Sequence, residues 1–216
     1  MTTATLDLFS EVLEETASVN PGKSDAINQQ VVSGINGLDY VPDFITLDEE
    51  RKILEKLEET EWLGDLERRV QHFGYKYNYK TRRIDESLRV GDLPKWLIYF
   101  GERLARMGFF EERPDQVIVN EYLPGQGISA HIDCEPCFGD TVVSLSLGSG
   151  CTMDFTKANS ADKLSLWLAP RSIVVLKSDA RYCWRHAIPK RKKDEVDGRI
   201  EVRERRVSLT FRKVKM

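Results

Sequence analysis

The second half of the chain consists of short β-type segments separated by turn residues, and this pattern restricts the fold more than any other feature. Seven such segments follow Pro114, at residues 117–122, 128–133, 141–147, 164–168, 172–176, 182–186 and 203–212. Breaks that contain Gly or Pro fall at residues 124–127, 148–150, 169–170 and 197–198. Short strands punctuated in this way are typical of antiparallel sandwiches and barrels. We therefore expect an antiparallel double-sheet jelly roll, also called a double-stranded β-helix.

Two helices are expected before these strands. Thr46 and Glu49 have the spacing of a capping box, and the following apolar residues recur at helical intervals: Leu47, Ile53, Leu54 and Leu57. The second helix is expected to begin at Pro94 and to end at Gly108, with an apolar face made of Trp96, Leu97, Phe100, Leu104 and Met107. Helices followed by strands favour a mainly β fold with flanking α-helices packed on one side.

Length and composition suit one domain with a full-sized core, because the chain has 216 residues and is 41% hydrophobic. We expect residues 1–37 to form a flexible tail and residues 38–216 to form the domain, with the jelly roll at 114–216. The chain contains no apolar run long enough for a membrane span, and its first residues lack the pattern of a signal peptide. These features predict a cytoplasmic protein, with nuclear entry left open, and we expect a monomer.

Charge is unevenly distributed, although the net charge is only −3. Acidic residues dominate positions 39–67, whereas Lys and Arg dominate positions 185–215. This asymmetry favours a polyanionic partner at one face, and a solvated surface of mixed sign is the simpler alternative.

Three residues have the pattern of a metal site. His131 and Asp133 lie two positions apart, so in a strand their side chains point to the same face. His186 ends a later expected strand and could supply a second imidazole. Two histidines and one carboxylate form the facial triad of non-haem Fe(II) oxygenases, which leaves positions open for a cosubstrate and for O₂. Taken alone, a His-x-Asp pair is more often a hydrogen-bonded surface pair, and only its context favours metal binding.

Together, five motifs resemble the AlkB family of Fe(II)- and 2-oxoglutarate-dependent dioxygenases over roughly residues 38–214. They are Asn120-Glu121-Tyr122-x-Pro124-Gly125, His131-x-Asp133, Ser144-Leu145-Ser146-Leu147-Gly148, Tyr182-x-Trp184-x-His186, and Arg206 with Arg212 in the frame Leu209-Thr210-Phe211-Arg212. The resemblance implies that His131, Asp133 and His186 ligate Fe(II).

The resemblance also implies a binding site for 2-oxoglutarate. Arg206 would pair with its distal carboxylate, for which the planar guanidinium of Arg is better suited than Lys. Asn120, Tyr122 and Arg212 match family positions that contact the cosubstrate, and Thr210 lies on the same strand face as Arg206. Ser208 stands where some relatives have Asn, which leaves its contact with the cosubstrate in doubt.

The activity implied by this family is oxidative demethylation of alkylated bases in DNA or RNA, in which 2-oxoglutarate and O₂ yield succinate and CO₂ and the methyl group leaves as formaldehyde. Residues 68–83 interleave aromatic and basic side chains, as expected for stacking a base and contacting phosphates. If this segment is a strand, Tyr75, Tyr77 and Tyr79 line one of its faces. In the family this part of residues 38–113 is a nucleotide-recognition lid. Candidate substrate contacts are Tyr75, Tyr77, Arg82, Arg83 and Glu135. Each tyrosine could equally pack on the core.

Two other functions remain open from the sequence. Residues 119–155 also resemble the tRNA wobble-uridine hydroxylases of the same family, which usually carry a further RNA-binding or methyltransferase domain. A protein of another class, a non-catalytic nucleic-acid-binding jelly roll, would not need a complete set of Fe(II) ligands with two arginines beside it.

Cys134 and Cys137 form a Cys-x-x-Cys motif, which can bind zinc or perform redox chemistry. A zinc deaminase is excluded by spacing, because it needs His-x-Glu with a later Pro-Cys-x-x-Cys. A structural zinc would need two further ligands, from His72, Cys151 or Cys183. We predict that all four cysteines are reduced thiols in a cytosolic setting.

Overall fold

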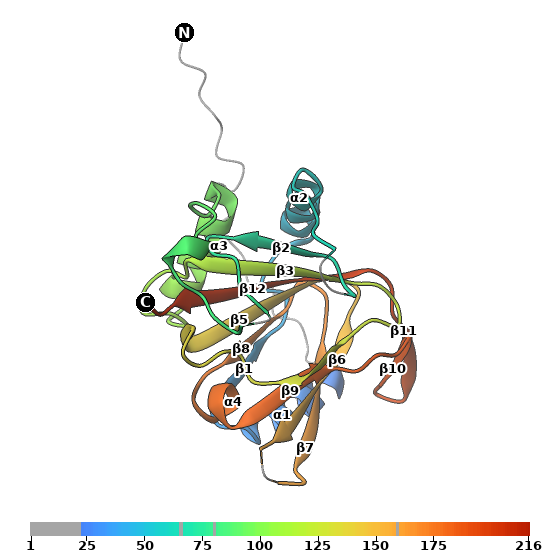
Figure 1. Ribbon diagram of the computed structural model, residues 1–216. Coiled ribbons are helices and arrows are strands. Elements are labelled where there is room, and N and C mark those ends of the chain that lie inside the picture. Colours follow the sequence, from blue (N-terminus) through green and yellow to red (C-terminus); the bar gives the residue numbers. More distant parts are fainter. Residues whose placement is uncertain (1–22, 65–66, 80, 159) are drawn as a thin grey trace.

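The fold is built on two antiparallel sheets, as the sequence predicts. A computed structural model describes residues 23–64, 67–79, 81–158 and 160–216. Figure 1 shows the two sheets facing each other, with two helices on the outer side of the larger sheet. The prediction of a mainly β jelly roll with flanking helices is confirmed.

The larger sheet has six strands, and its spatial order is β1-β8-β5-β12-β3-β2. Their bounds are β1 Leu38–Val41, β2 Val70–Phe73, β3 Gln116–Tyr122, β5 Phe138–Gly148, β8 Ile173–Leu176 and β12 Arg206–Val214. Strand β12 lies between β3 and β5, and Ser208 pairs with Asn120 on one side and with Ser146 on the other. The last strand of the chain therefore occupies the centre of the sheet.

The smaller sheet has four strands in the order β4-β9-β6-β7. Their bounds are β4 Ile128–His131, β6 Cys151–Lys157, β7 Lys163–Leu168 and β9 Trp184–Ile188. A separate hairpin, β10 Lys193–Val196 with β11 Arg199–Val202, connects β9 to β12. Strand β4 begins beside Gly127, where an added Cβ would lie 2.1 Å from the carbonyl oxygen of Ile188. Only glycine allows β4 and β9 to approach this closely.

Helices α2 (Leu47–Glu58) and α3 (Lys95–Arg106) cover the outer face of the larger sheet (Figure 1). The capping box of Thr46 and Glu49 is present, and Gly108 has φ +79 just after α3. The apolar faces of the two helices pack on the larger sheet and form one core with it. This core includes Ile53, Leu57, Leu97, Phe100, Leu104, Val119, Leu145, Leu209 and Phe211.

Three details of the helix prediction are wrong. Leu47 is 70% exposed, because it lies in the first turn and points away from the sheet. Met107 follows α3 and is exposed, and Pro94 precedes the first helical residue of α3 by one position. A short 3-10 helix at Glu86–Leu88 precedes α3.

Residues 23–37 are part of the fold, so the predicted flexible tail is wrong for this stretch. Helix α1 (Lys23–Ser33) packs beside β7 at the smaller sheet. The buried amide of Asn28 donates to the carbonyl of Trp167 at 2.9 Å and accepts from its N–H at 3.1 Å. Ile35 is buried in the second core cluster. The rest of the predicted tail, residues 1–22, lies outside the described residues.

The predicted strands differ from the observed ones mainly around the smaller sheet. Strand β6 and the hairpin β10–β11 were not predicted, and residues 203–205 precede β12 instead of belonging to it. Tyr182 lies in a short helix, α4 (Ser178–Tyr182), rather than in the strand that follows. Strand β6 has Thr152, Asp154 and Thr156 on one face, a polar alternation that we did not recognise as a strand.

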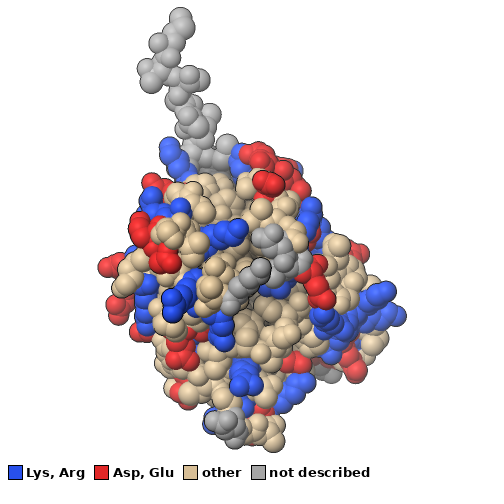
Figure 2. All heavy atoms as spheres, in the orientation of Figure 1, with Lys and Arg blue, Asp and Glu red and all other residues tan. Residues whose placement is uncertain are grey.

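The charge asymmetry is visible on the surface. Figure 2 shows Lys and Arg side chains gathered over the β10–β11 hairpin, and Asp and Glu side chains over α2. Within the described residues, no helix is both long and apolar enough to cross a membrane.

Candidate active site

The three residues of the predicted triad meet between the two sheets. His131 ends β4 and pairs with His186 of β9, so the two imidazoles are cross-strand neighbours with ring centres 4.4 Å apart. Asp133 lies just after β4. One ligand atom from each of the three residues lies within 4.8 Å of the others. This is the spacing required for three protein ligands on one side of a single metal ion.

The carboxylate of Asp133 is buried and paired. Its Oδ1 accepts a hydrogen bond from Nη2 of Arg212 at 2.6 Å, and its Oδ2 lies 3.5 Å from Nε2 of His186. Burial alone would raise the pKa of Asp133, but the positive charge of Arg212 and the nearby histidines outweigh it and hold the pKa well below its usual range. Asp133 is therefore an anion at neutral pH, as a metal ligand must be.

Both histidines can bind a metal in the neutral form, and a hydrogen bond fixes the tautomer of His131. Nδ1 of His131 is 2.8 Å from the carbonyl oxygen of Ser129, which fixes the proton on Nδ1 and leaves Nε2 free to coordinate. Burial, with the neighbouring His131, lowers the pKa of His186 to about 3. His186 is thus neutral near pH 7, which is the form that binds a metal.

Arg181 holds the backbone of the turn that carries Asp133, and our sequence analysis did not identify it. The residue lies in α4 and is only 1% exposed. Its guanidinium donates to the carbonyl oxygens of Asp133 (3.0 Å), Cys134 (3.4 Å) and Gly139 (3.4 Å). An arginine beside a strand has no distinctive sequence signal, so only the three-dimensional contacts reveal this positioning role.

Strand β12 presents a row of polar residues to the space between the sheets. Arg206, Ser208, Thr210 and Arg212 alternate along the strand and all line one cavity of about 530 Å³. The intervening residues, Val207, Leu209 and Phe211, face the opposite side and belong to the main core. The period of two in a strand thus separates the site from the core. The cavity also includes His131, Asp133, His186, Asn120 and Tyr122.

Arg206 is a buried cation whose bonding is incomplete. The residue is 3% exposed, its Nη2 donates to Ser146 Oγ at 2.9 Å, and its guanidinium lies 5.4 Å from the ring centre of Tyr122. Its Nε and Nη1 have no hydrogen-bond partner among the described residues. Unpaired donors on a buried charge are costly, and a carboxylate supplies the planar, bidentate partner that they lack. The site therefore fits an acidic cosubstrate such as 2-oxoglutarate.

Arg68 is another cavity residue that was not among our predicted contacts. Its Nε donates to Oδ1 of Asn120 at 2.8 Å, and its guanidinium lies 5.7 Å from the ring centre of Tyr122. Tyr122 therefore has a guanidinium of Arg68 and one of Arg206 within about 6 Å, the range of cation–π contacts. Burial raises the pKa of the Tyr122 hydroxyl, which stays protonated and able to donate a hydrogen bond.

The residues predicted to contact substrate divide into two groups. Tyr77 and Arg82 line the cavity, whereas Tyr75, Arg83 and Glu135 do not. Tyr75 instead packs against a small cluster around Phe138, and Glu135 is exposed. The expectation that the tyrosines share one face of a strand is wrong, because this segment forms only isolated bridges, Tyr75 with Arg89 and Asn78 with Arg83.

Tyr79 lines the cavity, although Tyr75 and not Tyr79 was among the predicted substrate contacts. Its ring contacts that of Tyr77 edge-on, at a centroid distance of 5.0 Å. Its hydroxyl is buried without a hydrogen-bond partner among the described residues, and burial raises its pKa. The hydroxyl is therefore a protonated donor close to the cavity.

The two cysteines after the metal ligand are joined, so the prediction of reduced thiols is wrong for this pair. Cys134 and Cys137 form a disulfide, with Cα atoms 5.3 Å apart. Sequence spacing could not reveal this, because the turn after Asp133 determines whether the two side chains meet. Cys151 and Cys183 are free, as predicted.

The fold and the site define a class of protein. Residues 37–212 match the 2OG-Fe(II) oxygenase superfamily, so the chain belongs to this family. It is an Fe(II)- and 2-oxoglutarate-dependent dioxygenase of the AlkB-like group, and Fe(II) and 2-oxoglutarate are its cofactor and cosubstrate.

Several curated proteins are similar along most of the chain. An uncharacterized protein, L905, of Acanthamoeba polyphaga mimivirus is 39% identical, covering 83% of this chain and 86% of its own length. The Arabidopsis thaliana alkylated DNA repair protein ALKBH8 homolog is also 39% identical, covering 84% of this chain and 59% of its own length. The mouse tRNA (carboxymethyluridine(34)-5-O)-methyltransferase ALKBH8 is 36% identical, covering 83% and 30% respectively. The chain thus spans about a third to three fifths of the two ALKBH8 proteins.

Solved structures support the fold. The structure of OsALKBH1 covers 82% of this chain and matches over 96% of its own length, with a TM-score of 0.61 and 18% identity. A Pseudomonas putida prolyl-4-hydroxylase covers 90% of this chain and matches over its whole length, with a TM-score of 0.52 and 13% identity.

Proposed function

We propose that this chain hydroxylates the side chain of a modified uridine in tRNA. The observation that carries the proposal is its similarity to ALKBH8 proteins from vertebrates, which are 33–37% identical over 83% of the chain and whose name refers to carboxymethyluridine at position 34 of tRNA. Residues 37–212, which match the oxygenase family, contain the three candidate metal ligands, so the chemistry of this chain would be oxidation rather than methyl transfer. This substrate replaces the alkylated bases that we put first from the sequence.

In this proposal His131, Asp133 and His186 would hold Fe(II). The bound Fe(II) and 2-oxoglutarate supply oxidative decarboxylation, in which O₂ gives one oxygen atom to succinate and the other to a C–H bond of the substrate. The protein contributes a fixed ligand geometry and a cavity that positions the reacting carbon.

The distal carboxylate of 2-oxoglutarate would be bound by Arg206, whose Nε and Nη1 lack partners among the described residues. Tyr122 and Thr210 line the same part of the cavity and would donate further hydrogen bonds. Asn120 already accepts from Arg68, so its amide nitrogen is the group that can reach a ligand. Arg212 pairs with Asp133 and would act mainly on the metal ligand rather than on the cosubstrate.

The uridine would enter beneath residues 74–79 and 81–84, which we call the lid segment. Tyr77 and Tyr79 place two aromatic rings at the cavity, and Arg82 lines it as well. Aromatic rings stack on an extruded base, and the exposed Arg82 would contact a phosphate. Arg83 forms a backbone bridge with Asn78 and does not line the cavity.

Oxidative demethylation of alkylated bases is the second candidate. The Arabidopsis relative is described as an alkylated DNA repair protein, and the probable RNA/DNA demethylase ALKBH6 of Danio rerio is 30% identical over 69% of this chain. Both reactions begin with the same C–H oxidation. The two reactions differ in the fate of the product. Demethylation gives a hydroxymethyl group on nitrogen, which is lost as formaldehyde, whereas hydroxylation of the uridine side chain gives a hydroxyl group on carbon, which remains.

Product analysis separates the two reactions. The enzyme is incubated with Fe(II), 2-oxoglutarate and O₂, and with either an anticodon stem-loop carrying a carboxymethylated uridine at position 34 or an oligonucleotide carrying N-methylated bases. We expect the uridine nucleoside to gain one oxygen atom, without release of formaldehyde. Formaldehyde release from the methylated oligonucleotide, with the uridine left unchanged, would instead establish the demethylase.

A further inference from the structure

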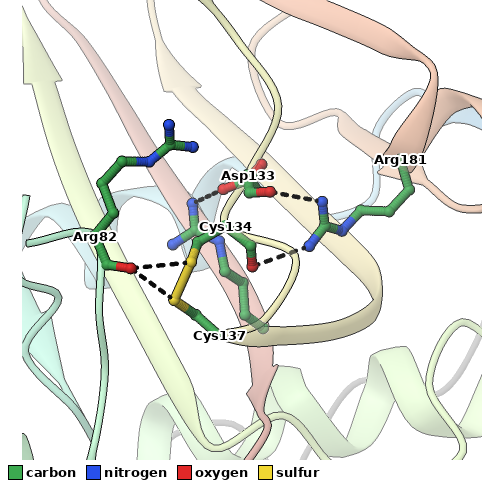
Figure 3. The surroundings of a disulfide bond; sticks show 6 residues. Arg82, Asp133, Cys134, Cys137 and Arg181 are labelled. Carbon is green, nitrogen blue, oxygen red and sulfur yellow. Dashed lines mark hydrogen bonds and ion pairs between the residues drawn. A yellow bond between two sulfur atoms is a disulfide. The ribbon is translucent and has the colours of Figure 1, made fainter.

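The disulfide between Cys134 and Cys137 lies between the metal site and the lid segment. Cys134 directly follows the ligand Asp133 and lines the active-site cavity, and both cysteines are buried. Figure 3 shows Arg82 of the lid segment on one side of the two sulfurs and Arg181 on the other side, near Asp133. A covalent change at the sulfurs would therefore occur in contact with both parts of the site.

The lid segment rests on this pair of cysteines. Cys134, Cys137, Phe138 and Val214 form a small buried cluster, and Tyr75, Tyr77 and Ile84 of the lid segment pack against it. Tyr77 also lies 5.8 Å from the ring centre of Phe138. Apolar side chains of the lid segment therefore pack directly on the two cysteines and Phe138 of the jelly roll.

One backbone carbonyl of the lid segment contacts both sulfurs. The carbonyl oxygen of Arg82 lies 3.3 Å from Sγ of Cys134 and 3.4 Å from Sγ of Cys137. These are hydrogen-bonding distances for sulfur, but a disulfide has no hydrogen to donate. Two thiols in the same place would have two S–H donors, and a carbonyl oxygen has two lone pairs to accept them.

Arg82 has a strained backbone conformation, so hydrogen bonds to its carbonyl oxygen would help to stabilise that conformation. Its φ is +52, a left-handed conformation that is uncommon for a residue other than glycine. One side of the turn is held by a hydrogen bond in which the N–H of Arg82 donates to the carbonyl of Asn78 at 2.8 Å. Donors at the Arg82 carbonyl would stabilise the other side.

We propose that Cys134 and Cys137 form a redox-active pair that controls how firmly the lid segment is held. The dithiol adds S–H hydrogen bonds to the Arg82 carbonyl, whereas the disulfide lacks these donors and leaves the lid segment held mainly by its apolar packing. The inference rests on the proposed function only in that substrate enters beneath this segment. The metal site itself should be insensitive, because Arg212 and Arg181 hold Asp133 independently of the sulfurs.

The chemistry requires a dithiol as reductant or a peroxide as oxidant. In reduction, one thiolate of the dithiol attacks a sulfur of the pair, the S–S bond breaks, and the released cysteine takes a proton. The second thiolate then attacks the mixed disulfide and frees the other cysteine, so two electrons and two protons have passed to the protein. In oxidation, one thiolate attacks a hydroperoxide, the O–O bond breaks, and an alcohol leaves with a proton. The other thiolate then attacks the resulting sulfenic acid, so that the S–S bond forms and water leaves.

The proposal can be tested without substrate by limited trypsin digestion of the full chain. Mn(II) replaces Fe(II), and buffers that contain either reduced dithiothreitol or a hydroperoxide set the state of the pair, which is verified by counting alkylated thiols. We expect cleavage after Lys76, Arg82 and Arg83 to be slower in the dithiol state, by about two- to tenfold, the effect of one added neutral hydrogen bond. Cleavage after Arg199, in the exposed hairpin, serves as the internal reference.

Three variants control for other effects. Cys134→Ala with Cys137→Ala removes both donors and should be cleaved rapidly and equally in both buffers. Cys134→Ser with Cys137→Ser retains O–H donors and should be protected in both. Cys183→Ser removes an exposed free thiol and should keep the full response. Melting curves show whether each variant is folded.

The proposal is overturned if no disulfide forms in the oxidising buffer, or if the lid segment is cleaved at the same rate in both states. Mn(II) affinity that changes together with cleavage would also reject it, because the effect would then arise at the metal site. The outcome does not depend on the identity of the substrate, so it remains distinct from failure of the tRNA assay.

Discussion

One oxygen of the Asp133 carboxylate pairs with Arg212, and the other faces the candidate metal site. Oδ1 accepts from Nη2 of Arg212 at 2.6 Å, while Oδ2 lies 3.5 Å from Nε2 of His186. One oxygen is thus held by a buried cation and only the other faces the two histidines. Asp133 therefore has a structural role in addition to ligation, whereas His186 makes no comparable ion pair.

This difference predicts that two ligand substitutions affect stability unequally. Both His186→Ala and Asp133→Ala should abolish turnover of 2-oxoglutarate. Asp133→Ala also leaves the buried Arg212 without its partner and should lower the free energy of unfolding by about 3–5 kcal/mol, the usual cost of breaking a buried ion pair. His186→Ala should cost about 1 kcal/mol, a typical value for a point substitution.

Urea unfolding monitored by circular dichroism gives both free energies, and a succinate assay gives turnover. Retained turnover in either variant would reject the proposed metal ligands. Equal stability losses would show that the Arg212 pair contributes little to folding.

Arg206→Lys tests the anchor for 2-oxoglutarate. Lysine keeps the positive charge but loses the planar fork that pairs with a carboxylate at two points. We expect the 2-oxoglutarate concentration for half-maximal turnover to rise roughly tenfold or more, since hydrogen bonds to charged groups contribute ~1.5–3 kcal/mol. Arg199→Lys, an exchange on the exposed hairpin, is the matched control and should leave this concentration unchanged. An unchanged value for Arg206→Lys would indicate another anchor.

The sequence revealed the site where local periodicity determines it. The period of two along residues 206–212 places Arg206, Thr210 and Arg212 on one face, and the structure shows all three at the cavity. Arg181 and Arg68 could not be predicted, because each reaches the site from an element whose orientation depends on tertiary packing. The pairing of Cys134 with Cys137 likewise depends on the turn after Asp133 and not on their spacing.

Comparison of Tyr77→Ala with Tyr75→Ala separates the effect of the lid segment on substrate binding from its effect on packing. Tyr77 lines the cavity and also packs near Phe138, whereas Tyr75 packs in the same cluster without reaching the cavity. We expect Tyr77→Ala to weaken binding of the stem-loop by ~1–3 kcal/mol, the loss of one stacking platform. Tyr75→Ala should lower the melting temperature with a smaller effect on binding.

Fluorescence anisotropy of a labelled stem-loop, measured beside thermal melting, compares these two tyrosine variants. Equal losses of affinity in both, in proportion to their melting temperatures, would mean that Tyr77 contributes to packing alone.

Tyr75 and Tyr79 differ from the prediction because the segment that carries them is not a strand. Alternation predicted Tyr75, Tyr77 and Tyr79 on one strand face, but Gly74 and the left-handed Arg82, with φ of +78 and +52, bend this segment out of a strand. The side chains then no longer alternate, so Tyr75 turns to the cluster and Tyr79 to the cavity. Helix α1 was missed because its sequence is largely polar, and its attachment depends on Asn28.

Glu121 should make the fold sensitive to acid. Its buried carboxylate accepts hydrogen bonds from Arg69 at 2.6 and 2.7 Å and from Arg205 at 2.6 Å. The hydrogen bond from Arg69, together with Arg205, outweighs burial and lowers its pKa below the ordinary 4.5. Because the folded-state pKa is depressed, this stabilisation is fully present above about pH 4.5 and is lost as the pH falls through the lower, folded-state value.

Unfolding free energies measured from pH 7 to pH 3 should therefore fall less steeply for Glu121→Gln than for the wild type. Glu55→Gln, at an exposed position on α2, is the control and should retain the wild-type slope. Parallel slopes for Glu121→Gln and the wild type would show that Glu121 does not contribute to the pH dependence.

The most direct test of the central claim follows the oxygen atoms. The enzyme is supplied with Fe(II), 2-oxoglutarate, the modified anticodon stem-loop and isotopically labelled O₂, and both products are analysed by mass spectrometry. We expect one labelled oxygen in succinate and one in the hydroxylated uridine side chain, in equal amounts, and neither product with His186→Ala. Succinate formed in full yield while the uridine gains no labelled oxygen would contradict the assignment of this chain as a uridine hydroxylase.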